Sequence, residues 1–170
     1  MVSKKLSAKL GPSIIVGNMD NNYILRSVRY ALKISDSKMI EIFGLGEYTI
    51  SKEELLTLLK PEEDKGFLLC SDKVMLSFLD GLIINKRGKQ ENKTGTPQKS
   101  STLNNNIILK KIRIALNFKE EDMLATFKLA ELDVSKSELT AIFRRPDHKN
   151  YKECGDQFIK NFLKGLALKK

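Results

Sequence analysis

The chain is poor in the residues on which many catalytic and metal sites depend. It has no tryptophan, one histidine and two cysteines among 170 residues. Two cysteines cannot form a disulfide framework, and one histidine with one nearby cysteine leaves a zinc site short of its four ligands. The motifs His-Glu-x-x-His and Gly-x-Ser-x-Gly and a glycine-rich phosphate loop are also missing from the sequence. We therefore expect no catalytic residue, no metal and no cofactor.

Long apolar runs are missing as well. No stretch approaches the roughly 18 apolar residues of a membrane helix, and the run at residues 14–16 is too short for the core of a signal peptide. Cys70 and Cys154 are expected to pack as small apolar side chains, which fits a reducing compartment. The sequence therefore predicts a cytoplasmic protein that has no membrane partner.

Charge is unevenly distributed along the chain. The net charge is +9, and residues 19–86 carry −2, whereas residues 1–18, 87–105 and 106–170 carry +3, +3 and +5. This excess permits contact with an acidic partner such as RNA or DNA. Solubility alone is the other explanation for the same distribution.

The chain contains an internal duplication. Residues 21–86 align with residues 105–170 by a shift of 84 positions and without a gap. Identities recur along the whole length, from Asn22 on Asn106 to Gly81 on Gly165. So many identities in one register indicate a repeat. Features shared by both copies are expected to serve the fold, and features found in one copy are better candidates for function.

Each copy has the pattern of four helices. In the first copy, apolar residues at helical spacing predict helices from about residue 22 to 34, from 35 to about 44, from 51 to 60 and from 72 onwards. Ser51 with Glu54, and Ser135 with Glu138, predict capping boxes. Gly81 and the equivalent Gly165 interrupt the last helix, which predicts close approach of another backbone. We therefore expect an all-α fold of two tandem, pseudo-symmetric four-helix repeats that share a core.

Four segments follow from this pattern. Residues 1–18 form an N-terminal extension, which we expect to be mobile and to precede a natural start at Met19. Repeat one covers residues 19–86 and repeat two covers residues 105–170. Between them, residues 87–104 are rich in glycine, serine, threonine and lysine and predict a flexible basic linker.

Several segments resemble a known family. They are residues 24–32 (ILRSVRYAL), 105–113 (NNIILKKIR), 146–151 (PDHKNY), 153–158 (ECGDQF) and 161–166 (NFLKGL). These segments are similar to the bacterial YehS-like family, a duplicated domain of unknown function. The resemblance covers residues 19–170, whereas residues 1–18 depart from the family pattern. It implies a small, cytoplasmic, all-helical protein and brings no established activity.

The largest difference between the copies lies between their third and fourth helices. Residues 60–67 (KPEEDKGF) are acidic, whereas residues 144–152 (RRPDHKNYK) are basic and carry the only histidine. Arginine and lysine at these positions could contact phosphates, and the tyrosine could stack on a base. The predicted nucleic-acid-binding residues are Arg144, Arg145, Lys149, Tyr151 and Lys152, together with Lys110, Lys111 and Arg113 on the first helix of the same copy. The alternative is a solvated loop whose charges pair with neighbouring carboxylates, with the tyrosine ring in the core like Phe67.

Three functional interpretations remain open beside nucleic-acid binding by a non-enzymatic protein. A protein-interaction or adaptor module would use an apolar surface between the repeats to bind a partner helix or a second copy. A helix-turn-helix would place the third helix of the second copy in a groove, with Lys136, Ser137, Thr140, Arg144 and Arg145. An enzyme would use a polar site of Asp147, His148 and Asp156 as acid–base groups.

Overall fold

The computed structural model describes residues 19–89 and 103–169, and these residues form eight α-helices and no strand. Repeat one contains α2 (Asn21–Leu32), α3 (Asp36–Leu45), α4 (Lys52–Leu59) and α5 (Asp72–Arg87). Repeat two contains α6 (Asn105–Leu116), α7 (Glu120–Leu129), α8 (Lys136–Ile142) and α9 (Asp156–Leu168). The predicted all-α fold of two tandem four-helix repeats is confirmed.

Serine side chains begin three of the four helices in repeat one. Ser35, Ser51 and Ser71 precede α3, α4 and α5, and each hydroxyl accepts a hydrogen bond from the backbone N–H three residues on. Such a cap satisfies one of the N–H groups that a helix leaves unpaired at its first turn. The helix starts are therefore determined by local sequence, as the pattern predicted.

The capping box is complete in repeat two and incomplete in repeat one. The N–H of Glu138 donates to Ser135 Oγ (3.1 Å), and the Glu138 carboxylate accepts the N–H of Ser135 (3.0 Å). In repeat one, Glu54 instead accepts a hydrogen bond from the Tyr48 hydroxyl (2.5 Å). The predicted capping box of Ser51 and Glu54 in repeat one is therefore wrong. Tyr48, which stands where repeat two has Leu132, offers the Glu54 carboxylate a competing donor.

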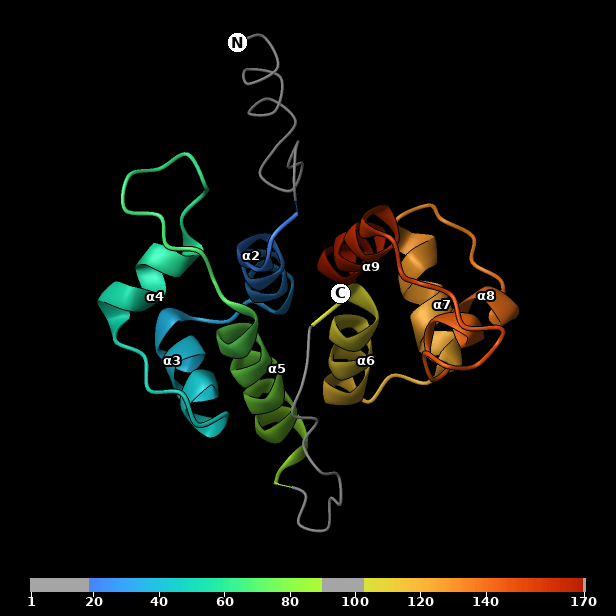
Figure 1. The fold of residues 1–170 in the computed structure, drawn as a ribbon, viewed down its shortest axis with the longest axis horizontal. Coiled ribbons are helices and arrows are strands. Elements are labelled where there is room, and N and C mark those ends of the chain that lie inside the picture. The colour runs from blue at the N-terminus through green and yellow to red at the C-terminus, as the bar shows by residue number, and fades with distance from the viewer. Residues whose placement is uncertain (1–18, 90–102, 170) are drawn as a thin grey trace, which may run out of the picture.

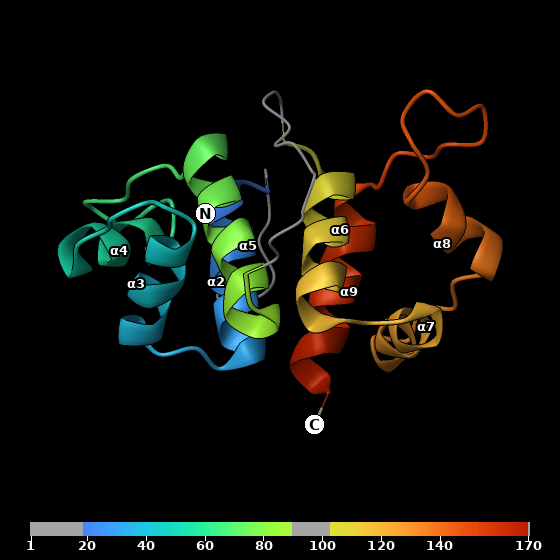
Figure 2. The same cartoon turned by 90° about the horizontal axis from the view of Figure 1, so that it is seen from below.

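The eight helices form a central group with a pair of helices on either flank. Helices α2, α5, α6 and α9 lie at the centre, α3 and α4 lie on one side, and α7 and α8 lie on the other (Figures 1 and 2). Between the repeats, α5 packs on α6 and α2 packs on α9. Because α2 corresponds to α6 and α5 to α9, these two contacts are equivalent under the duplication. The repeats are therefore related by a pseudo-two-fold axis, which confirms the predicted pseudo-symmetry.

The core is continuous through both repeats. Phe43 packs against Phe78 with ring centroids 5.3 Å apart, and the equivalent Phe127 and Phe162 lie 5.4 Å apart. All four rings are fully buried, and they belong to one cluster of buried side chains that spans both repeats. Such tilted aromatic pairs add about 0.5–1.5 kcal/mol each beyond the burial of their area.

Two glycines let helices approach closely at equivalent places. A Cβ added at Gly81 would lie 1.8 Å from the carbonyl oxygen of Ile42, and one at Gly165 would lie 1.9 Å from that of Thr126. The backbones of α3 and α5, and of α7 and α9, therefore touch where no side chain fits. This confirms the close approach that the duplicated glycines predicted.

Some predictions fall outside the described residues. Residues 1–18 lie there, as does most of the predicted linker, residues 90–102. Helix α5 continues through Arg87, one residue into the segment expected to be linker. Among residues 19–89 and 103–169, none of the helices has the length and apolar character needed to span a bilayer.

Candidate functional site

The basic loop of repeat two is held at both ends by one buried side chain, Asn106. The Asn106 side-chain amide donates to the carbonyl oxygens of Ile142, at the end of α8, and Lys152, at the end of the loop (both 2.9 Å). Its oxygen accepts the N–H of Cys154 (2.9 Å). A buried side chain with three satisfied hydrogen bonds positions the loop firmly, because breaking it would leave backbone groups unpaired.

Repeat one holds its own loop in the same way. The Asn22 amide donates to the carbonyl oxygens of Leu58 and Leu68, and its oxygen accepts the N–H of Cys70. Backbone bonds within the two loops also correspond: the N–H of Asp64 reaches Pro61 O (3.0 Å), as that of His148 reaches Arg145 O (2.9 Å). The two loops therefore share a scaffold and differ in the side chains that they present.

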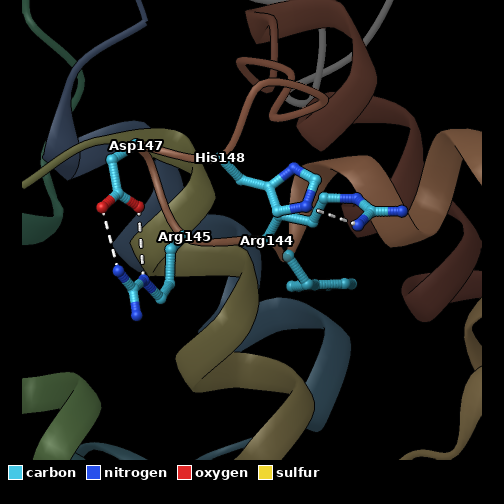
Figure 3. A pocket seen from close by; sticks show the side chains of 5 residues that line it. Arg144, Arg145, Asp147 and His148 are labelled. Atoms are coloured by element: carbon cyan, nitrogen blue, oxygen red, sulfur yellow. Dashed lines mark hydrogen bonds and ion pairs between the residues drawn. The ribbon is translucent and has the colours of Figure 1, made fainter.

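Arg144 and His148 face one another at the start of the basic loop (Figure 3). Arg144 Nη1 lies 3.2 Å from His148 Nε2, and the backbone N–H of Asn150 points at His148 Nδ1 from 2.9 Å. A neutral imidazole has one lone pair and one N–H. Two donors therefore compete for one acceptor, and one of them faces an N–H. The Nε of Arg144 is also buried and has no hydrogen-bond partner among the described residues.

Arg145 and Asp147 form a second pair, which points to the other side of the loop (Figure 3). Arg145 Nε and Nη2 donate to the two carboxylate oxygens of Asp147 over 3.2 and 2.9 Å. The hydrogen bond from Arg145 lowers the pKa of the Asp147 carboxyl, so the pair is charged on both sides and neutral as a whole. Arg145 is thus less available to an external anion than Arg144. Together with Phe143, these four residues line a pocket at the end of repeat two.

The remaining loop residues divide into exposed and half-buried side chains. Lys149 and Lys152 are exposed, and no ion pair holds either of them within the described part of the chain. Tyr151 is half-buried, as is Phe67 at the equivalent place in repeat one. Burial also raises the pKa of the Tyr151 hydroxyl. The two lysines are therefore free for contact with an anion, whereas part of the Tyr151 ring is covered.

The three predicted cations of α6 have different surroundings. Arg113 donates to the carbonyl oxygen of Phe118 (3.1 Å), as Arg29 does in repeat one, and its guanidinium lies 4.9 Å from the ring centroid of Phe143. Arg113 therefore lies beside the loop, but its guanidinium is already held by Phe118 and Phe143. Lys111 pairs with Asp80 of α5 over 2.7 Å.

Lys110 is the cation of α6 that remains exposed beside the loop. It shares a helix face with Asn106 and Arg113, because residues three or four apart are neighbours on a helix, and both of these contact the loop or its base. The equivalent residue in repeat one, Arg26, donates to the carbonyl oxygen of Lys60, the counterpart of Arg144 (3.1 Å). Lys110 can therefore extend the surface formed by Arg144, Lys149 and Lys152.

Asp156 and the two cysteines have structural partners. Asn105 donates a hydrogen bond to Asp156 (2.9 Å), and Asn21 donates the same bond to Asp72 in repeat one. The contact is thus part of the duplicated scaffold. Cys70 and Cys154 are buried in the core cluster, which confirms the predicted packing, and this burial raises the pKa of both thiols to about 12.

The polar site of Asp147, His148 and Asp156 stays a prediction, but each of these three residues has a different partner: Arg145, Arg144 and Asn105. Within residues 19–89 and 103–169, no group of three His, Cys, Asp or Glu side chains is placed to hold a metal ion.

The role of Asn22 and Asn106 in holding the two loops was not predicted from the sequence. Both residues are identical between the repeats and both lie in the first turn of an otherwise apolar helix face, which was the available signal. An amide at this place could equally have been solvent-exposed, so the sequence did not show whether these asparagines lie on the surface or hold the loops. We call Asn22 and Asn106 the asparagine clamps, because each holds its loop by three hydrogen bonds.

Comparison with known proteins assigns the chain to a family. The family described as "Protein of unknown function (DUF1456)" matches residues 21–88 and again residues 105–170. The chain belongs to this family. It is also 46% identical over 149 residues to the uncharacterized protein YehS of Escherichia coli (strain K12), covering 88% of this chain and 95% of that relative. The double match confirms the duplication, and the relative confirms the YehS-like resemblance. No solved structure matches the chain.

Proposed function

We propose that this member of the family binds nucleic acid through the phosphate backbone, using the loop at residues 144–152 of repeat two. The observation that carries the proposal is the contrast between two loops that have one scaffold. In repeat one, residues 62–64 present three carboxylates, which are hydrogen-bond acceptors. In repeat two, Arg144 and His148 present donors for which the described residues offer too few acceptors. Phosphate oxygens would supply them.

The available side chains favour binding that does not depend on base sequence. Arg144, Lys149, Lys152 and Lys110 can contact phosphates, which carry no sequence information. Tyr151 is half-buried, so it offers little ring surface for stacking on a base. Phosphate contacts supply essentially all of non-specific affinity and make it strongly dependent on salt. We therefore expect weak, salt-sensitive binding to single strands of any sequence.

The test is fluorescence anisotropy with a labelled single-stranded oligonucleotide. Four phosphate contacts predict a slope of about −3 for log K against log salt, and hence about fifty-fold weaker binding at ~200 mM than at ~50 mM NaCl. The triple variant Arg144→Gln/Lys149→Gln/Lys152→Gln should lose most of the affinity. The matched control is Lys52→Gln/Lys60→Gln/Lys65→Gln, which removes the same charge from the end of repeat one and should keep it. Absence of binding at low salt contradicts the proposal.

A second readout needs no label. Because the chain has no tryptophan and four tyrosines, it absorbs weakly at 280 nm, and nucleic acid that co-purifies at low salt should raise the ratio of absorbance at 260 nm to that at 280 nm. A high-salt wash should lower this ratio, and the triple variant should show a low ratio from the start.

A protein-interaction module is the second candidate, and one observation favours it. Leu56, Leu68 and Leu69 at the outer end of repeat one are 42%, 46% and 63% exposed, and repeat two has Thr140, Lys152 and Glu153 in their places. The neighbouring carboxylates of residues 62–64 suit a partner segment that is both apolar and basic. The apolar part of such binding should hold or strengthen at high salt, whereas binding to phosphates should weaken steeply.

A further inference from the structure

The corner between Arg144 and His148 has more donors than acceptors, whichever way the imidazole proton is placed. If the proton is on Nε2, that N–H faces Arg144 Nη1, which is also a donor, across 3.2 Å. If it is on Nδ1, it faces the N–H of Asn150 across 2.9 Å. The guanidinium can only donate. A proton on Nε2 keeps the Asn150 bond and leaves the Arg144 side of the ring without an acceptor.

The guanidinium itself is incompletely bonded. Arg144 Nε is buried and has no partner among the described residues, while the neighbouring Arg145 is paired with Asp147 on the other side of the loop. The carboxylate nearest in sequence is thus taken by another arginine. An oxygen atom placed at this corner could accept hydrogen bonds from Arg144 and His148 at once.

We propose that Arg144 and His148 form a binding site for one phosphoryl oxyanion, with an oxygen accepting hydrogen bonds from both side chains. A cation is disfavoured because the guanidinium is positively charged and can only donate, and because the Asp147 carboxylate is paired with Arg145 on the other side of the loop (Figure 3). A phosphate fits because a guanidinium fork matches its geometry and because charged hydrogen bonds are stronger than neutral ones. This inference rests on the proposed function only for the source of the phosphate, which in that function is the nucleic-acid backbone. A free phosphate ion has the same chemistry and could bind the same site.

Repeat one lacks this site, which gives the experiment an internal control. Asp64 replaces His148, so an acceptor stands where repeat two has a ring N–H. Lys60 replaces Arg144, and its ammonium donates to the carbonyl oxygen of Lys65 (3.0 Å). Lys60→Gln therefore removes the equivalent charge without touching the proposed site.

The test is proton NMR of the intact chain at constant pH. His148 is the only histidine, so its imidazole C–H signals are assigned without ambiguity. Inorganic phosphate and a dinucleoside monophosphate are added in separate titrations, with sodium chloride at matched ionic strength as the reference. We expect both phosphate probes to shift the His148 signals to saturation, and chloride to leave them in place.

Arg144→Gln should weaken phosphate binding about tenfold or more, the effect of losing a charged hydrogen bond, and Lys60→Gln should leave it unchanged. Arg144→Lys keeps the charge but loses the fork, so it should also bind more weakly than the wild type. Circular dichroism of each variant checks that the fold is retained. The inference is overturned if neither phosphate probe moves the His148 signals beyond the chloride reference, or if Arg144→Gln responds like the wild type.

The two proposals fail separately. If inorganic phosphate binds at His148 but no oligonucleotide binds at low salt, the site stands and the nucleic-acid function is wrong. If oligonucleotides bind with the expected salt dependence while His148 does not respond to any phosphate, the function stands and this site is wrong. If only the dinucleoside monophosphate binds, the site stands and its source of phosphate is a phosphodiester.

Discussion

The two loops that follow α4 and α8 share their scaffold and have opposite chemistry. Each is held by three hydrogen bonds from one buried asparagine, Asn22 or Asn106. Yet the first presents three carboxylates and exposed leucines, and the second presents arginine, lysine and histidine. Buried polar groups are costly to change, whereas exposed side chains away from special features contribute little to stability. Stability has therefore kept the clamps alike and left the exposed loop surfaces free to diverge.

The interface between the repeats shows a similar divergence. Lys111 pairs with Asp80, and Lys160 lies over the ring of Tyr23, 5.4 Å from its centroid. The pseudo-two-fold axis relates Lys111 to Ser27 and Asp80 to Lys164. The ion pair therefore has no counterpart on the other side of the axis. Two copies of repeat two would thus bring Lys111 against Lys164, a like-charge contact that discourages such pairing. This contact therefore favours repeat one with repeat two over repeat two with itself.

The largest effect is expected at the glycines that the two repeats share. Gly81→Ala and Gly165→Ala would each place a Cβ within 2 Å of a backbone carbonyl oxygen, so helices must separate. Each should lower the free energy of unfolding by about 3 kcal/mol or more, measured by urea denaturation. The control is Gly44→Ala: a Cβ there meets nothing within 4 Å, and a helical alanine should stabilise by about 0.5–1 kcal/mol. A tolerated alanine at either shared glycine contradicts the packing.

The asparagine clamps come next and separate scaffold from function. Asn22→Ala and Asn106→Ala should each cost about 2–3 kcal/mol of unfolding free energy, because each leaves buried backbone groups without partners. Equal losses would confirm that the clamps are equivalent. Only Asn106→Ala should also weaken oligonucleotide binding, because Asn106 positions the basic loop. Equal loss of binding in both variants would mean that the basic loop is not the interface.

The buried thiols predict an effect that is absent at neutral pH, appears only above pH 9.0 and is equal in both repeats. The pKa of each thiol is raised from 9.0 to about 12 in the fold, so the unfolded chain releases its protons first as pH rises. Stability from this source is complete below pH 9.0 and falls between pH 9.0 and about 12, by at most about 1.4 kcal/mol per pH unit for each thiol. Cys70→Ala/Cys154→Ala should lose stability less steeply there in urea titrations. If the double variant and the wild type lose stability equally steeply above pH 9.0, the fold does not raise the pKa of either thiol.

The smallest effect is expected at the ion pair between the repeats. Asp80→Lys places two cations together, and Lys111→Asp in the same chain restores an opposite-charge pair. Because both side chains are partly exposed, the coupling in a double-mutant cycle should be about 0.5–1 kcal/mol and should shrink at high salt. A coupling of zero at low salt would remove Asp80 and Lys111 from the features that distinguish the two halves of the interface.

The candidate site could be predicted in part. The sequence located the basic loop and its histidine, because the difference from residues 60–67 is visible in the letters alone. It did not show which cations are free, because their partners lie on other elements. Lys111 meets Asp80, which is 31 residues away, and Arg113 is held by Phe118 and Phe143. The incomplete capping box at Glu54 has the same origin, since Tyr48 reaches it from outside α4.

The amino-acid sequence by itself determined the helices, their starts, the duplication and the two glycine contacts, because each is a local pattern or recurs in both copies. Only the tertiary structure decided that Asn22 and Asn106 are clamps, that Arg145 is paired, and that Arg144 and His148 face each other short of an acceptor. The physical reason is that a polar side chain has the same letter whether it is solvated, buried or paired, and its partners are set by packing.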